Sequence, residues 1–94
     1  MTNNNIAISS LAMDLKRVAI GYQGGSYKMA ERFKKEALKR KSEIVLSEVK
    51  PYLRKFIKFL PRILEHVDKN RVAEDSLTYS TIFQNYVLTF KINP

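Results

Sequence analysis

Apolar residues at helical spacing, interrupted by a single pair of glycines, constrain most strongly how this chain of 94 residues folds. The first series recurs at intervals of four, three and four residues: Leu11, Leu15, Val18 and Tyr22. Such intervals place side chains on one face of an α-helix, so we predict a helix over residues 9–23. One face of this helix is expected to be buried.

The segment "GYQGGS" ends this predicted helix, because Gly24 and Gly25 readily adopt the left-handed backbone of a helix C-cap. A second, strongly amphipathic helix is expected over residues 26–45. Such a short break folds two helices back on each other. The free N–H groups at the start of the second helix, with Ser26 and Lys28 beside them, could hold one phosphate.

Two prolines delimit a third helix in "KPYLRKFIKFLPR", residues 50–62. Pro51 is tolerated in a first helical turn, where its missing N–H costs little. Pro61 lies ten residues further on, and there we expect a kink or a break into two short segments.

The last segment, from Val72 to about Phe90, admits two interpretations. It is rich in β-branched and aromatic residues, and its end alternates as a hairpin turning at Gln84-Asn85 would. However, this dipeptide is a poor hairpin turn, and the aromatic residues of the segment keep helical spacing. We therefore expect a helix to about residue 88 with a frayed or extended tail, and the state of residues 86–92 stays open.

These patterns predict an all-α fold, a small four-helix bundle whose third helix is kinked or broken at Pro61. Ninety-four residues suffice for one hydrophobic core, so residues 1–94 are expected to form a single helical domain. Residues 1–7 are polar at their start and are expected to be a frayed N-terminus.

Composition narrows the function. The formal net charge of +8 favours polyanionic partners, nucleic acid above all. The chain has no cysteine, and His66 is its only histidine, so we expect neither a metal nor a cofactor, and no enzymatic activity. The chain start lacks a basic leader region, and no apolar run reaches the ~18 residues that span a bilayer. We expect a soluble, cytoplasmic protein without a membrane partner.

The third helix carries an unusual run of positive charge with no acid inside it. Lys50, Arg54, Lys58 and Arg62 are spaced by four, with Lys55 beside them. Like charges at this spacing cost a few tenths of a kcal/mol per pair in an isolated helix. The ridge is consistent with a solvated face, a phosphate-contacting face or a membrane-surface helix; the last is disfavoured because the core needs the helix's apolar residues.

A similar ridge on the second helix would merge with this one if the two helices packed antiparallel. A surface of this kind contacts the backbone of DNA or RNA without sequence preference. We therefore predict a non-catalytic module, a small accessory subunit of a larger nucleic-acid-processing complex such as a DNA replication or repair enzyme. The predicted nucleic-acid-binding residues are Lys28, Arg32, Lys35, Lys39, Lys50, Arg54, Lys55, Lys58 and Arg62.

The alternative is a protein-interaction adaptor or an oligomerising bundle, in which the charge serves solubility or an acidic partner. Many polar side chains fall on the last helix, and burying them in one small core is costly. One face of that helix would then contact a larger protein partner or a second copy. The residues of the last helix that we predict to make this contact are Tyr79, Phe83, Gln84 and Tyr86. The competing interpretation is that the hydroxyls bond back to their own helix or face water.

The segment "RILEH" resembles the Arg-then-His motif of the HEPN family, which comprises small helical ribonucleases and nucleotidyltransferase partners. The resemblance covers five residues, and Arg62 and His66 are closer in sequence than in most members. It implies a helical bundle and, as a third functional hypothesis, ribonuclease activity that depends on His66.

Overall fold

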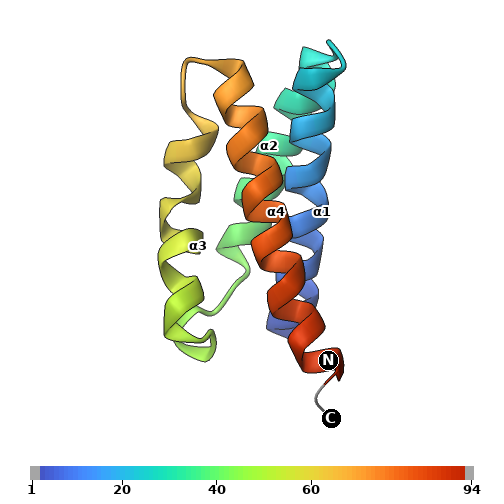
Figure 1. The fold of residues 1–94 in the computed structure, drawn as a ribbon. Helices are drawn as coiled ribbons and strands as arrows, with labels where there is room; N and C mark the ends of the chain where they lie inside the picture. The colour runs from blue at the N-terminus through green and yellow to red at the C-terminus, as the bar shows by residue number, and fades with distance from the viewer. Residues whose placement is uncertain (1–2, 93–94) are drawn as a thin grey trace.

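The computed structural model describes residues 3–92 and contains four α-helices and one short 3₁₀ helix. They are α1 (Asn3–Gln23), α2 (Tyr27–Ser42), η1 (Leu46–Glu48), α3 (Pro51–Leu64) and α4 (Lys69–Ile92). Figure 1 shows that successive α-helices run in alternating directions, with α4 between α3 and α1. No strand occurs between residues 3 and 92, so the prediction of a small all-α bundle is confirmed.

The first helix begins at Asn3, six residues earlier than predicted. The side chain of Asn4 anchors this start to the chain that follows α2: its amide donates to the carbonyl of Val45 (2.8 Å), and its carbonyl accepts from the Val45 N–H (2.9 Å). The expectation of a frayed N-terminus is therefore wrong for residues 3–7, while residues 1–2 lie outside the described part. Asn4 can be buried because both polar atoms of its side-chain amide are hydrogen-bonded to the backbone of Val45.

The central element is α1, which packs along α2 and α4. Its buried face is wide and includes Ile8, Leu11, Leu15 and Val18, all fully covered. Contact with two neighbours leaves α1 only a narrow exposed strip. The predicted apolar series is thus confirmed as part of the core.

The backbones of α1 and α2 approach each other closely at Gly21. A Cβ atom at this position would lie 2.7 Å from the backbone nitrogen of Ala30 and 2.9 Å from its Cβ. The turn that follows uses Gly25 at φ +80°, as expected of a residue that ends a helix. The helical hairpin predicted from the glycine pair is therefore present.

A polar cluster closes the end of the bundle where α1, α2 and α4 meet. The Tyr22 hydroxyl donates to Glu31 (3.0 Å), and Lys69 at the start of α4 lies over the Tyr22 ring (5.6 Å). Burial, together with this hydrogen bond, raises the pKa of the Tyr22 phenol to about 12. The same bond lowers the pKa of Glu31. The Glu31 carboxylate of α2, together with Tyr22 of α1 and Lys69 of α4, thus connects three helices at this end of the bundle.

Asp14 is a buried acid at the contact between α1 and α2, and its Oδ2 atom has no hydrogen-bond partner. Burial raises its pKa above the ordinary value of 3.8, and Glu36 acts in the same direction. Arg40 and Arg17 oppose this shift but do not cancel it. An ionised Asp14 therefore destabilises the native bundle.

The third helix is one uninterrupted element from Pro51 to Leu64, so of the two expected alternatives at Pro61 the break is wrong, and the kink stays a prediction. Pro51 takes the first helical position, as predicted. Pro61 lies within the last turn, where the only helical bond lost is the one to the carbonyl of Ile57. The helix can therefore continue for the three residues that remain.

The neighbour of α3 is α4, not α2. Edge-to-face ring contacts join Tyr52 to Tyr86 (6.0 Å) and Phe56 to Tyr79 (5.3 Å). By contrast, α2 and α3 run antiparallel but barely touch. The expectation that these two helices pack closely is wrong.

The last helix extends to Ile92, so the hairpin interpretation is wrong and the predicted end near residue 88 is too early. Asp68 caps its start by accepting from the Asn70 N–H (3.0 Å). The hydroxyls of Thr78, Thr81 and Thr89 donate to carbonyls four residues earlier. The interpretation in which hydroxyls bond back to their own helix is thus confirmed for these threonines, which lowers the cost of polar residues on α4.

We predict that Gly21→Ala destabilises the bundle, although alanine is the better helix former by about 1 kcal/mol. The added methyl group would collide with the backbone of Ala30, and overpacking of this kind costs about 1–3 kcal/mol. Urea denaturation measures the change. Lys16→Ala is the control at an exposed site of the same helix and should stay within about 0.5 kcal/mol of the parent; an equally stable Gly21→Ala variant would contradict the close contact.

We predict that Asp14→Asn raises the free energy of unfolding at neutral pH. A folded-state pKa above 3.8 means that Asp14 contributes most favourably below that pH, and that this contribution is lost as pH rises through the raised pKa. The advantage of the asparagine variant should therefore be small near pH 3.8 and grow towards neutral pH. Denaturation of both proteins across this range tests it, and a pH-independent difference would contradict it.

Candidate nucleic-acid interface

The four predicted cations of α2 lie on one exposed ridge, opposite the buried face formed by Ala30 and Ala37. They form no ion pair within the described chain, whereas Lys34 and Arg40 on the same helix pair with Glu31 and Glu43. We call them the α2 ridge: Lys28, Arg32, Lys35 and Lys39. The prediction that they face solvent is confirmed.

A second ridge runs along α3, where Lys55, Lys58 and Arg62 are exposed and have no acidic partner in the described structure. We call these three residues the α3 ridge. Lys50, just before the helix, is also exposed, and its N–H donates to the Tyr86 hydroxyl (3.3 Å). The sequence thus located the positive charge of this helix correctly.

Arg54 is the exception. It is half-buried, and its guanidinium donates from Nε to the Val49 carbonyl (2.7 Å) and from Nη2 to the Ser47 carbonyl (3.3 Å). These bonds fix the link between η1 and α3. The expectation that Arg54 extends freely to solvent is wrong, because its donors already satisfy backbone carbonyls.

Aromatic rings lie between the cations of α3. Arg62 lies over the ring of Phe59 (5.6 Å), and Lys55 over that of Phe56 (5.3 Å). Phe59 and Tyr52 are themselves about half exposed. Exposed rings beside cations can stack on unpaired bases, whereas a ridge of lysines alone contacts only phosphate.

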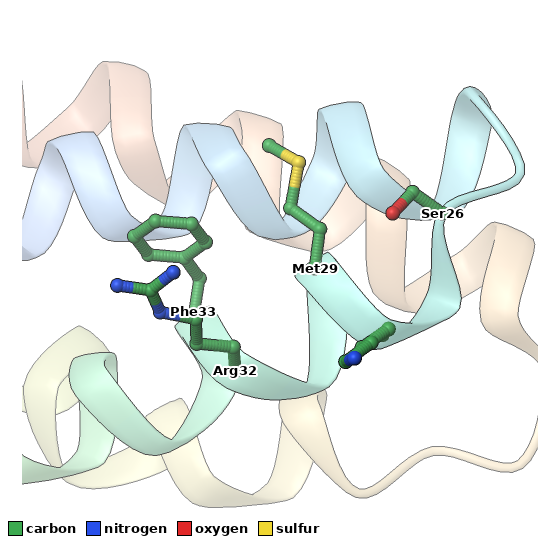
Figure 2. A pocket seen from close by; sticks show the side chains of 5 residues that line it. Ser26, Met29, Arg32 and Phe33 are labelled. Atoms are coloured by element: carbon green, nitrogen blue, oxygen red, sulfur yellow. The ribbon is translucent and has the colours of Figure 1, made fainter.

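A shallow pocket of about 300 Å³ opens at the start of α2. Figure 2 shows Met29 and Phe33 projecting from one side of α2 with Arg32 beside the ring, and Ser26 at the helix start. Two guanidinium groups flank Phe33: Arg32 at 5.5 Å and Arg17 at 5.2 Å from the ring centre. Ser26 makes no side-chain capping bond.

Arg17 was missed from the sequence. It lies in α1, and only the packing of α1 on α2 places it over Phe33. No spacing within α1 indicates which ring of another helix Arg17 meets. The exposed aromatic residues of α3 could have been found, because Tyr52 and Phe59 fall on the border of the apolar face.

The two ridges do not lie on closely packed helices. Since α3 packs on α4 and barely contacts α2, the two ridges lie on helices that are not close neighbours. The predicted merger depended on close packing of α2 with α3, which the structure lacks. Each ridge is therefore a candidate phosphate-contacting surface by itself.

The predicted partner-binding residues of α4 do not form one surface. Phe83 is 0% exposed and Tyr86 is 4% exposed, so both belong to the core. Tyr79 is half-buried between Phe56 and Phe83, and only Gln84 is exposed. The four residues therefore do not form one exposed surface, because Phe83 and Tyr86 lie on the faces that α4 turns to its neighbours.

His66 lines a second pocket, of about 200 Å³, between the end of α3 and the start of α4. Its Nδ1 accepts from the Asp68 N–H (3.1 Å), so a neutral ring carries its proton on Nε2. Arg62 and Arg71 line the same pocket, and Arg71 pairs with Asp75 (3.7 Å). Arg62, Ile63 and His66 of "RILEH" thus border a small hollow that Arg71 and Asp75 also line.

Residues 3–92 contain no group of three or more potential metal ligands, and none of their helices is long and apolar enough to cross a membrane. What they present is a small up-and-down bundle with two basic ridges. Comparisons with protein-family models, curated proteins and solved structures gave no match to this chain. The resemblance to the HEPN family therefore rests on five residues alone.

We predict that Arg54→Ala destabilises the fold by about 1–2 kcal/mol, because Val49 and Ser47 lose their hydrogen-bond donors. Lys58→Ala, on the exposed side of the same helix, should be nearly neutral. Thermal and urea denaturation compare the two variants. Equal stabilities would show that the Arg54 bonds contribute nothing in solution.

Proposed function

We propose that this protein is a non-catalytic basic module that contacts the sugar-phosphate backbone of nucleic acid, as a small accessory subunit of a larger nucleic-acid-processing complex such as a DNA replication or repair enzyme. The observation that carries the proposal is a set of seven exposed cations on α2 and α3, none of which has an acidic partner in the described structure: Lys28, Arg32, Lys35, Lys39, Lys55, Lys58 and Arg62.

The cost of this arrangement supports a role for it. Cations at helical spacing repel one another, and the acids of this chain are placed so that they do not relieve the α3 ridge. Contact with phosphates removes the repulsion and releases the counterions condensed on the nucleic acid. The net charge of +8 adds long-range attraction to the same partner.

The type of contact follows from the side chains. Lysine is a flexible point charge that contacts phosphates without reading sequence, and five of the seven cations are lysines. One of these five, Lys55, lies over the ring of Phe56. The half-exposed Phe59 and Tyr52 add surfaces on which unpaired bases can stack. We therefore expect single strands to bind at least as well as duplexes through α3.

The binding experiment uses fluorescence anisotropy with labelled single- and double-stranded DNA and RNA over a series of salt concentrations. We expect affinity to fall steeply with salt. Replacing Lys55 and Lys58 together with glutamine should weaken binding and reduce the slope of log K against log[salt] by about 1.8 on duplex DNA, since each lost phosphate contact removes about 0.9. Lys35→Gln with Lys39→Gln measures the α2 ridge in the same way.

The matched control combines Lys16→Gln with Lys41→Gln, which lowers the net charge from +8 by the same two units outside both ridges. It should change the slope less than either ridge variant. If all three double variants lose affinity equally, the attraction is due to net charge and the ridges are not binding sites. Absence of binding at low salt would refute the proposed function, and cleavage of the RNA probe would refute the non-catalytic part.

A further inference from the structure

The pocket at the start of α2 combines apolar and cationic side chains. Its volume of about 300 Å³ is within the range of sites that hold small ligands. Met29 and Phe33 are half-buried and project from the same side of α2 (Figure 2), whereas Lys28 and Arg32 are exposed. We call the five lining residues the α2 pocket: Ser26, Lys28, Met29, Arg32 and Phe33.

Two guanidinium groups from different helices meet at the ring of Phe33. Arg17 of α1 and Arg32 of α2 both lie within the ~6 Å of the ring centre over which a cation is attracted to an aromatic face. Neither makes a hydrogen bond or an ion pair among residues 3–92, in contrast to Arg54, whose donors are bound to carbonyls. Their N–H groups are therefore available to an anion.

The acids of α1 and α2 do not neutralise these cations, and none of them lines the pocket. Glu31 accepts from the Tyr22 hydroxyl and pairs with Lys34. Asp14 is buried and makes no ion pair with Arg17. The pocket therefore has an excess of positive charge at its border.

The start of α2 adds to this charge. Ser26 makes no side-chain capping bond, and the first turn of the helix contains no acid. The N–H groups of a first turn have no partners within the helix, and the helix dipole places partial positive charge there. Cations, a helix start and apolar side chains thus border one hollow.

These groups fit a planar aromatic ring that carries a phosphate. Unpaired bases stack on aromatic rings and on guanidinium planes, and the thioether of Met29 makes favourable contacts with aromatic rings. Arginine binds phosphate through two parallel N–H donors. A nucleotide supplies both parts, whereas an acidic peptide supplies carboxylates without the ring.

The pocket is continuous with the α2 ridge, because Lys28 and Arg32 belong to both. From Lys28 to Lys39 the ridge extends about 16 Å at 1.5 Å per residue, which spans several successive phosphates of one strand at about 3.4 Å each. A strand whose backbone follows this ridge therefore brings a nucleotide to the pocket. Its base must be unpaired, since a base inside a duplex is stacked and cannot enter a pocket.

We propose that the α2 pocket holds one unpaired nucleotide of a single strand, with its base against Phe33 and Met29 and its phosphate at Arg17 and Arg32. This inference rests on the proposed function and deepens it, because it makes one end of the α2 ridge a site for a base. It also gives a binding role to Arg17, which lies outside both ridges.

The test compares a labelled thymidine oligonucleotide with an abasic strand of the same length, which carries the same phosphates without bases. Fluorescence anisotropy should show that the parent protein prefers the thymidine strand. Phe33→Leu should lower the affinity for this strand about fivefold or more, the lower end of what the loss of one stacked base gives. The affinity of this variant for the abasic strand should stay nearly unchanged.

Arg17→Gln is compared with Lys16→Gln, which removes the same charge from the neighbouring exposed residue of α1. Arg17→Gln should weaken the binding of both strands and reduce the slope of log K against log[salt] by about 0.7, the value for one phosphate contact on a single strand. Lys16→Gln should change the slope less. Because Arg17 is exposed, this pair tests the site even if Phe33→Leu, which alters packing against the core, fails to fold.

The outcomes separate this inference from the proposed function. If the parent protein binds neither strand at low salt, the proposed function fails. If it binds both strands equally, or if its preference for thymidine survives Phe33→Leu, contact with the backbone remains and the base site in the α2 pocket is overturned. Equal effects of Arg17→Gln and Lys16→Gln would overturn the phosphate contact of Arg17.

Discussion

The close approach of α1 and α2 at Gly21 and Ala30 is the constraint on which the arrangement of this bundle depends. Fully buried residues of α2 are small, Ala30 and Ala37, so α2 contributes to the core by lying near α1 and less by inserting large side chains. A short separation brings many backbone and Cβ atoms into van der Waals contact, which compensates for the missing bulk. Most of the remaining surface of α2 is then available for charge, and this is where the α2 ridge lies.

A different balance holds on the other side of the bundle. There α3 supplies large residues, with Leu53, Ile57, Leu60 and Leu64 buried, and it rests on α4 through edge-to-face aromatic contacts. Its amphipathic division is sharp, so its outer face can be basic without cost to the core. Arg54 is the one cation of that face used by the fold itself, where it satisfies two carbonyls before the helix.

The surfaces that remain have different chemistry. The outer faces of α2 and α3 are cationic, whereas the exposed strip of α1 is apolar and nearly uncharged. Polyanions are attracted to the cationic faces of α2 and α3. The apolar strip of α1, by contrast, is stabilised only when another apolar surface covers it. A nucleic-acid contact and a protein contact can therefore coexist on one small bundle without competing for residues.

The sequence by itself indicated four helices and the outer faces of α2 and α3 that carry charge, because apolar periodicity at 3.6 residues per turn shows which face of a helix is buried. It located the α2 and α3 ridges for the same reason. Only the tertiary structure decided that α3 packs on α4, that Asn4 anchors Val45, that Arg54 serves the backbone and that Phe83 and Tyr86 are buried. Periodicity shows that a face is covered but not by which helix, since partners are selected by contacts between residues far apart in the chain.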